Sequence, residues 1–75
     1  MANKEGTLHL HASGRWAIIR PGREPFQLTS GDVFRVNVNG MLHATSMEHL
    51  WGEGYYSVDG FLLGNGIRAA IGAED

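Results

Sequence analysis

The chain has 75 residues, eleven glycines, no cysteine and a formal net charge of −2 at pH 7, which allows one domain with a thin core and excludes disulfides and thiolate metal sites. The lack of cysteine also fits a reducing, cytoplasmic setting, and apolar runs such as residues 16–19 fall far short of the roughly 18 residues of a membrane-spanning helix. The charge disfavours a nucleic-acid-binding protein, which usually carries a basic excess.

The ends of the chain differ in composition from the middle. We expect residues 1–5 to be a disordered lead-in, residues 6–73 to form a single small β domain, and residues 74–75 to be a tail. The glycines are dispersed between short apolar runs, which indicates frequent turns rather than a flexible linker. This pattern favours a barrel or sandwich of short strands.

The first predicted hairpin begins with residues 7–12, which alternate polar and apolar side chains as a half-buried strand does. Ser13-Gly14 is a two-residue turn signal, so residues 15–20 should return beside the first strand. This register pairs Leu8 with Ile19 and Leu10 with Ala17 on the core side. It leaves Trp16 on the other side, opposite His11.

The next segment, residues 21–31, is irregular, and Pro25 within it excludes a central strand. Phe26 and Leu28 should still enter the core from this loop. Residues 33–38 alternate clearly, and Asn39-Gly40 is the strongest short-range hairpin signal, because both positions accept a positive φ. Residues 41–51 then return as a long strand, with or without a bulge, whose pattern leaves open which face is buried.

The last third contains more turns. Gly52 to Gly54 predicts a three-residue loop that makes Trp51 and Tyr55 a cross-strand pair. A short strand over residues 55–58 should turn at Asp59-Gly60 into a strand over residues 61–63. Beyond a turn at residues 64–66, residues 67–71 fit either a last strand or one helical turn, since five residues are too few for helix propensity to decide.

These elements predict an all-β fold of five to seven short antiparallel strands in sequential hairpins. A chain of this size protects its edge strands best by curling into a small barrel. An SH3-like barrel is the first choice, and an OB-like barrel or a meander sandwich is the alternative.

Four segments, GRWAI (14–18), SGDVFRV (30–36), GYYSVDG (54–60) and GIRAA (66–70), resemble a family of short bacterial domains of unknown function. The resemblance covers roughly residues 7–72. It implies a small β fold and a bacterial or mobile-element origin, and it carries over no catalytic or binding residue.

Two groups of side chains could carry chemistry. His9 and His11 would share one strand face at a spacing suited to two ligands of one metal, with His43 and His49 as further donors. A solvent-facing role for these imidazoles is the stronger interpretation, because no carboxylate or cysteine stands at ligand spacing nearby. Glu48 with His49 could in principle perform acid–base work, but carboxylates in turns, such as Glu53 and Asp59, mostly cap or solvate, so we predict no catalytic residue and no cofactor.

Rings and arginines predict a protein interface. The folded part carries five arginines and no lysine, and arginine is enriched at interfaces whereas lysine is depleted. Five acidic residues balance them between Gly6 and Ala73. The core has enough other apolar side chains to spare some aromatic ones, so exposed rings beside arginines would be interface anchors. The predicted interface residues are Trp16, Trp51, Tyr55, Tyr56, Arg15 and Arg35.

The leading functional hypothesis is therefore a non-enzymatic binding or assembly module, with a second copy of the chain or another protein as partner. A small barrel that stacks its rings on nucleic acid is the second hypothesis, disfavoured by charge. A metal-dependent enzyme, or one with its site at an oligomer interface, is the third, because one chain of this size rarely encloses a substrate pocket.

Overall fold

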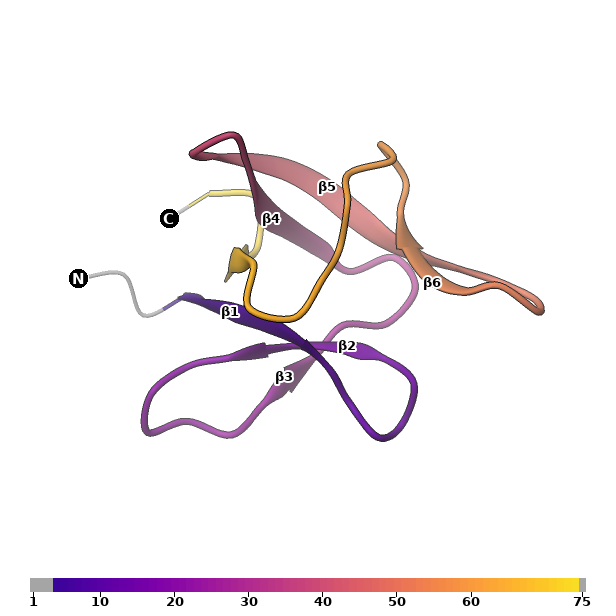
Figure 1. Cartoon of the computed structure of the whole chain (residues 1–75), viewed down its shortest axis with the longest axis horizontal. Coiled ribbons are helices and arrows are strands. Elements are labelled where there is room, and N and C mark those ends of the chain that lie inside the picture. Colours follow the sequence, from indigo (N-terminus) through magenta and orange to yellow (C-terminus); the bar gives the residue numbers. More distant parts are fainter. Residues whose placement is uncertain (1–3, 75) are drawn as a thin grey trace.

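The computed structural model describes residues 4–74 and shows an all-β fold, as the sequence predicts (Figure 1). Seven antiparallel strands form one curled sheet in the order β3-β2-β1-β7-β4-β5-β6, a half-barrel whose two end strands are β3 and β6. The described residues contain no helix. The strands are β1 (Glu5–Leu10), β2 (Trp16–Ile19), β3 (Phe26–Gln27), β4 (Val33–Val38), β5 (Met41–Leu50), β6 (Gly54–Ser57) and β7 (Arg68–Ile71).

The strands do not follow one another across the sheet as sequential hairpins would. β7 lies between β1 and β4 and pairs with both, which corrects the predicted strand order. Of the two predictions for residues 67–71, a strand or one helical turn, the strand is the one observed. Ala69 and Ala70 are fully buried there. Ala69 faces the core beside Val36, whereas Ala70 lies opposite Arg35 on the other face of the sheet. This burial outweighs the helix propensity of alanine.

The hairpin of β4 and β5 has the predicted register, with Val38 opposite Met41. Asn39 has φ 53° and Gly40 has φ 90°, as a two-residue turn with a positive φ at both positions requires. The long strand β5 buries Thr45 and Met47, so its inward face is the one that begins at Met41.

The hairpin of β1 and β2 differs from its predicted register by one residue. Its loop has three residues, 12–14, because the N–H of His11 donates to the carbonyl of Arg15 at 2.8 Å. Gly14 has the positive φ, 90°, that closes such a loop. Leu8 therefore lies opposite Ile18, and both are buried. The shift also turns Trp16 toward the body of the domain, where it packs half-buried against the core.

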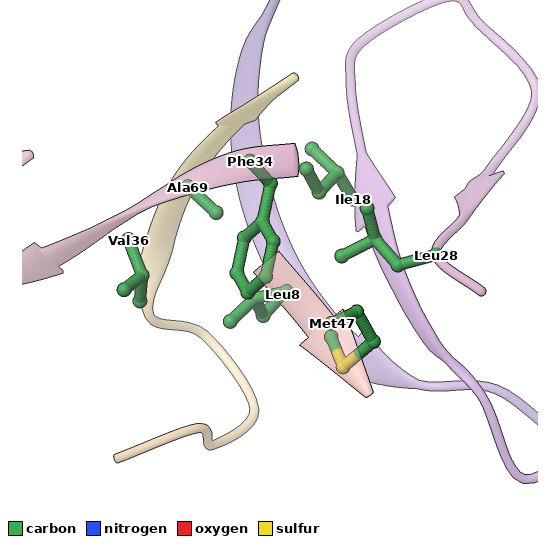
Figure 2. Packing of buried hydrophobic residues seen from close by; sticks show 7 residues of the cluster. All are labelled: Leu8, Ile18, Leu28, Phe34, Val36, Met47 and Ala69. Carbon is green, nitrogen blue, oxygen red and sulfur yellow. The ribbon is translucent and has the colours of Figure 1, made fainter. Parts of the chain in front are cut away.

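The core lies on the concave side of the sheet, and its buried side chains come from β1, β2, β4, β5, β7 and the loop after β3 (Figure 2). Phe34 is the largest of them. Phe26 and Leu28 contribute as predicted, with Leu28 fully buried and Phe26 packed against the cluster. The cluster consists of Leu8, Ile18, Leu28, Phe34, Val36, Met47 and Ala69.

Two further segments depart from expectation. Residues 61–63 are not a strand, although Phe61 and Leu63 pack against the core while Leu62 points outward. At the start of the chain, Glu5 is the first residue of β1, and the carbonyl of Lys4 accepts a hydrogen bond from the N–H of Ile71 at 3.0 Å. Residues 1–3 of the predicted lead-in, and Asp75 of the tail, lie outside the described residues.

Candidate protein-interaction site

β5 changes partner along its length and so produces a hairpin that leaves the body of the sheet. Residues 41–46 pair with β4, whereas residues 47–50 pair with β6. We call residues 47–59 the arm; its loop lies at the far right of Figure 1. The arm is thus a two-stranded extension whose second strand, β6, ends the sheet.

The loop of the arm consists of residues 51–53, one residue earlier than predicted, so Trp51 is not the partner of Tyr55. Tyr55 lies opposite His49, with ring centroids 4.6 Å apart. At the other end of the arm the buried Met47 lies opposite Ser57 and belongs to the core cluster. Trp51 consequently stands at the loop with 91% of its surface exposed.

The outer face of the arm combines apolar side chains with one carboxylate. Because side chains alternate along a strand, Leu50, Tyr56 and Val58 share the face opposite Met47 with Glu48, the cross-strand partner of Tyr56. The exposed fractions of Leu50, Tyr56 and Val58 are 52%, 44% and 47%. A strand pair with one solvated face usually places polar residues there, whereas three of the four side chains named on this face are apolar.

Below the arm, an open groove of about 330 Å³ lies between β6, the first residue of β2 and the segment that follows β6. The hydroxyl of Ser57 holds that segment in place, accepting the N–H of Phe61 at 2.8 Å and donating to its carbonyl at 3.3 Å. We call this the aromatic groove, and its lining residues are Trp16, Tyr55, Tyr56, Ser57, Gly60, Phe61, Leu62 and Leu63.

The groove brings together most of the residues that the sequence predicts for an interface. Trp16, Tyr55 and Tyr56 line it, and Arg15 stands at its rim, where its Nε–H donates to the hydroxyl of Tyr55 at 3.3 Å. This bond connects the β1–β2 loop to the base of the arm. The structure also adds Leu62, 81% exposed, which the sequence suggested only as part of a strand.

Arg35 lies elsewhere. It is only 7% exposed, and its guanidinium donates to the carbonyls of Ile71 and Gly72, both at 3.1 Å. These bonds hold the end of β7 against β4. The structure therefore separates Arg35 from the rings that it was predicted to frame.

The two histidines of the candidate metal pair make separate contacts, and β1 ends between them at Leu10. His9 contacts the hydroxyl of Thr7 at 3.2 Å, whereas Nδ1 of His11 accepts the N–H of Ser13 at 3.0 Å in the loop. Over residues 4–74, no three histidine or acidic side chains gather as a group that could hold a metal ion. Glu48 and His49, neighbours on β5, point to opposite faces of the arm.

Charge is segregated along the chain in a way that a total count does not reveal. Between Arg35 and Arg68 the sequence contains no lysine or arginine, and its only charged residues there are Glu48, Glu53 and Asp59. All three belong to the arm. The arm is therefore acidic as well as apolar, while Arg15 brings positive charge to the groove beneath it.

Comparison with known proteins agrees with the resemblance inferred from the sequence. No curated protein and no solved structure matches the chain. The part of the chain that the structure describes includes no helix able to cross a membrane. One family model, a domain of unknown function (DUF5348), matches residues 6–71, which include all seven strands apart from Glu5. The chain belongs to this family of domains of unknown function.

Proposed function

We propose that this domain is a non-enzymatic protein-binding module that assembles with a second copy of itself through the arm and the aromatic groove. The observation that carries the proposal is the exposure of large apolar side chains in one region, from 44% for Tyr56 to 91% for Trp51. Contiguous exposed apolar surface marks interaction sites in soluble proteins. A reducing bacterial cytoplasm is the setting that fits a cysteine-free chain.

Self-association suits the size of the domain. The core cluster contains seven side chains, one of them alanine, and small domains often gain stability from a partner subunit. Burial of one large apolar side chain contributes about 1.5–3 kcal/mol. Covering Leu50, Trp51 and Tyr56 would therefore add a substantial part of the stability of a domain this small.

The charges around the rings favour a protein partner over nucleic acid. Glu48, Glu53 and Asp59 belong to the same arm as the exposed rings, with Glu48 opposite Tyr56, and they would repel phosphates. Tryptophan, tyrosine and arginine are the residue types that most often dominate binding at protein interfaces, and Trp51, Tyr56 and Arg15 supply all three types here.

Size-exclusion chromatography with light scattering tests the proposal on the wild-type chain between about 1 µM and about 1 mM, a range that detects micromolar dissociation constants. We expect the mass to rise with concentration from that of one chain, 8.2 kDa, toward twice that value. A constant monomer mass throughout this range would contradict self-association. Salt-dependent binding of short single-stranded oligonucleotides would instead support the nucleic-acid alternative.

A further inference from the structure

We infer that the two copies associate reciprocally, with the indole ring of Trp51 from each copy seated in the aromatic groove of the other. This inference rests on the proposed self-association and adds the contact that forms it. The occupant of each groove is a second copy of this chain. Three features of the described residues support it: an exposed ring without a site in its own chain, an empty apolar groove of suitable size, and opposite charges beside each.

The exposed ring is Trp51. At 91% exposure it makes almost no contact within its own chain, although it is one of only two tryptophans in the sequence. Gly52 follows it with φ 83°, a left-handed conformation that lets the loop turn sharply just beyond the ring. The loop therefore presents the indole to solvent at the end of the arm.

The receiving site is the aromatic groove. Its volume of about 330 Å³ lies within the range of pockets that take small ligands, so it has room for one indole. Trp16, Tyr55 and Phe61 supply aromatic walls, and aromatic pairs gain about 0.5–1.5 kcal/mol beyond the burial of their area. Leu62, 81% exposed beside the groove, would be covered by the same contact.

The positions of ring and groove on one hairpin explain why the contact would be reciprocal. Trp51 lies two strand positions beyond His49, the partner of Tyr55, and four beyond Met47, the partner of Ser57. Tyr55 and Ser57 line the groove, so the ring stands roughly 7–13 Å from them along the strand direction. When a two-fold axis places two arms side by side in opposite directions, the loop of each reaches the base of the other. Such a contact closes on itself, giving a dimer and not a filament.

Charge complementarity supports the same pairing. Glu53 lies two residues after Trp51, and Arg15 stands at the rim of the groove. The bond to the hydroxyl of Tyr55 uses only the Nε–H of Arg15. A guanidinium has five donor hydrogens, so the terminal nitrogens of Arg15 can still bind a carboxylate. A Trp51 ring seated in the partner groove would bring Glu53 near Arg15 of that partner.

Three variants test the inference through the dissociation constant of the dimer, measured by sedimentation equilibrium. Trp51→Ala should raise this constant at least tenfold. Met41→Ala is the matched control, because Met41 is 67% exposed at the turn between β4 and β5 and lies outside the groove and the arm. Leu62→Ala should also raise the constant, by about threefold.

A charge exchange tests the receiving site itself. Arg15→Glu alone and Glu53→Arg alone should each weaken the dimer about tenfold, because like charges would then meet across the interface. The double variant should return to within about threefold of the wild type. As a second measurement, the natural lack of cysteine allows a mixture of Glu53→Cys and Arg15→Cys chains to be oxidised. A mixed disulfide dimer should form, in far higher yield than from Met41→Cys with Arg15→Cys.

The outcomes separate this inference from the proposed function. A wild-type chain that stays monomeric overturns both. A dimer that Trp51→Ala leaves unchanged keeps self-association and overturns the role of Trp51. A dimer that Trp51→Ala weakens, but in which neither the charge exchange nor the mixed disulfide behaves as stated, overturns the groove as the site that receives the ring.

Discussion

The body of the domain and its arm are made of the same kind of antiparallel strand but differ in what covers their faces. In the body, β7 has a neighbour on each side, and its alanines are completely buried. In the arm, β5 still bonds to Gly31 and Asp32 through the backbone of Met47, but beyond Met47 its strand partner is β6. No strand lies beyond β6 among residues 4–74. The buried side chains of the core therefore come mostly from the body, whereas Leu50, Trp51 and Tyr56 of the arm remain exposed in one copy.

The body and the arm also differ in the faces on which their apolar side chains lie. β4 alternates in the usual way, with Phe34 and Val36 on the core side. The arm instead has apolar residues on both faces, Met47 inside and Leu50 with Tyr56 outside. An isolated two-stranded hairpin is marginally stable in water, and exposed apolar side chains on its outer face add no stability to one copy. They support the proposal of a partner that covers this face.

The largest effect should come from breaking the body. Phe34→Ala removes the largest buried side chain of the core and should lower the free energy of unfolding by about 3–5 kcal/mol. Native proteins have total stabilities of about 5–15 kcal/mol, so this single substitution should remove a large part of the stability of so small a domain. Urea titration followed by circular dichroism measures the change.

The matched control for Phe34→Ala is Val58→Ala on the arm. Val58 is 47% exposed, so its truncation should change the free energy of unfolding by about 0.5 kcal/mol or less in a dilute sample. Equal losses in the free energy of unfolding for the two variants would show that Val58 supports the fold of one copy as much as Phe34 does. The distinction between body and arm would then be wrong.

A smaller effect should follow from releasing the end of β7. Arg35→Met removes the bonds to the carbonyls of Ile71 and Gly72 and should cost about 2 kcal/mol, as hydrogen bonds from charged groups do. Hydrogen exchange should quicken most at the N–H groups of Ile71 and Gly72, which bond to Lys4 and Val33. An unchanged exchange rate at both would rule out the anchoring role.

Arg23→Met is the control for that experiment, because Arg23 is exposed in the loop between β2 and β3. It removes the same charge from the body without touching β7. We expect no change in exchange at either N–H group.

Local turn chemistry decided how well each hairpin could be predicted. Asn39-Gly40 admits one loop length, since a positive φ at two consecutive residues defines a two-residue turn. Ser13-Gly14 contains one glycine, and a single positive φ closes a three-residue loop equally well. The sequence around residues 51–54 has glycines at two positions, Gly52 and Gly54, and again permits two loops one residue apart.

The features that could not be predicted from the sequence depend on contacts between distant parts of the chain. The position of β7 between β1 and β4 depends on contacts between residues more than sixty positions apart, such as Glu5 with Ala70, and no local pattern contains this information. The burial of Arg35 follows from the same arrangement. By contrast, the exclusively acidic charge between Arg35 and Arg68 is plain in the sequence, and counting charges by segment would have found it.

The smallest effect on the folding of one copy should come from the most exposed residue of the arm. Trp51→Ala should change the free energy of unfolding by no more than about 0.5 kcal/mol when both proteins are dilute and monomeric, because 91% of Trp51 faces solvent. At high concentration the two proteins should differ: binding between native copies raises the melting temperature of the wild type with concentration, and Trp51→Ala should flatten that dependence. Calorimetry over a hundredfold range of concentration measures it. A large loss of stability in the dilute sample would mean instead that Trp51 supports the fold of a single copy, and the distinction between body and arm would then fail at its most exposed residue.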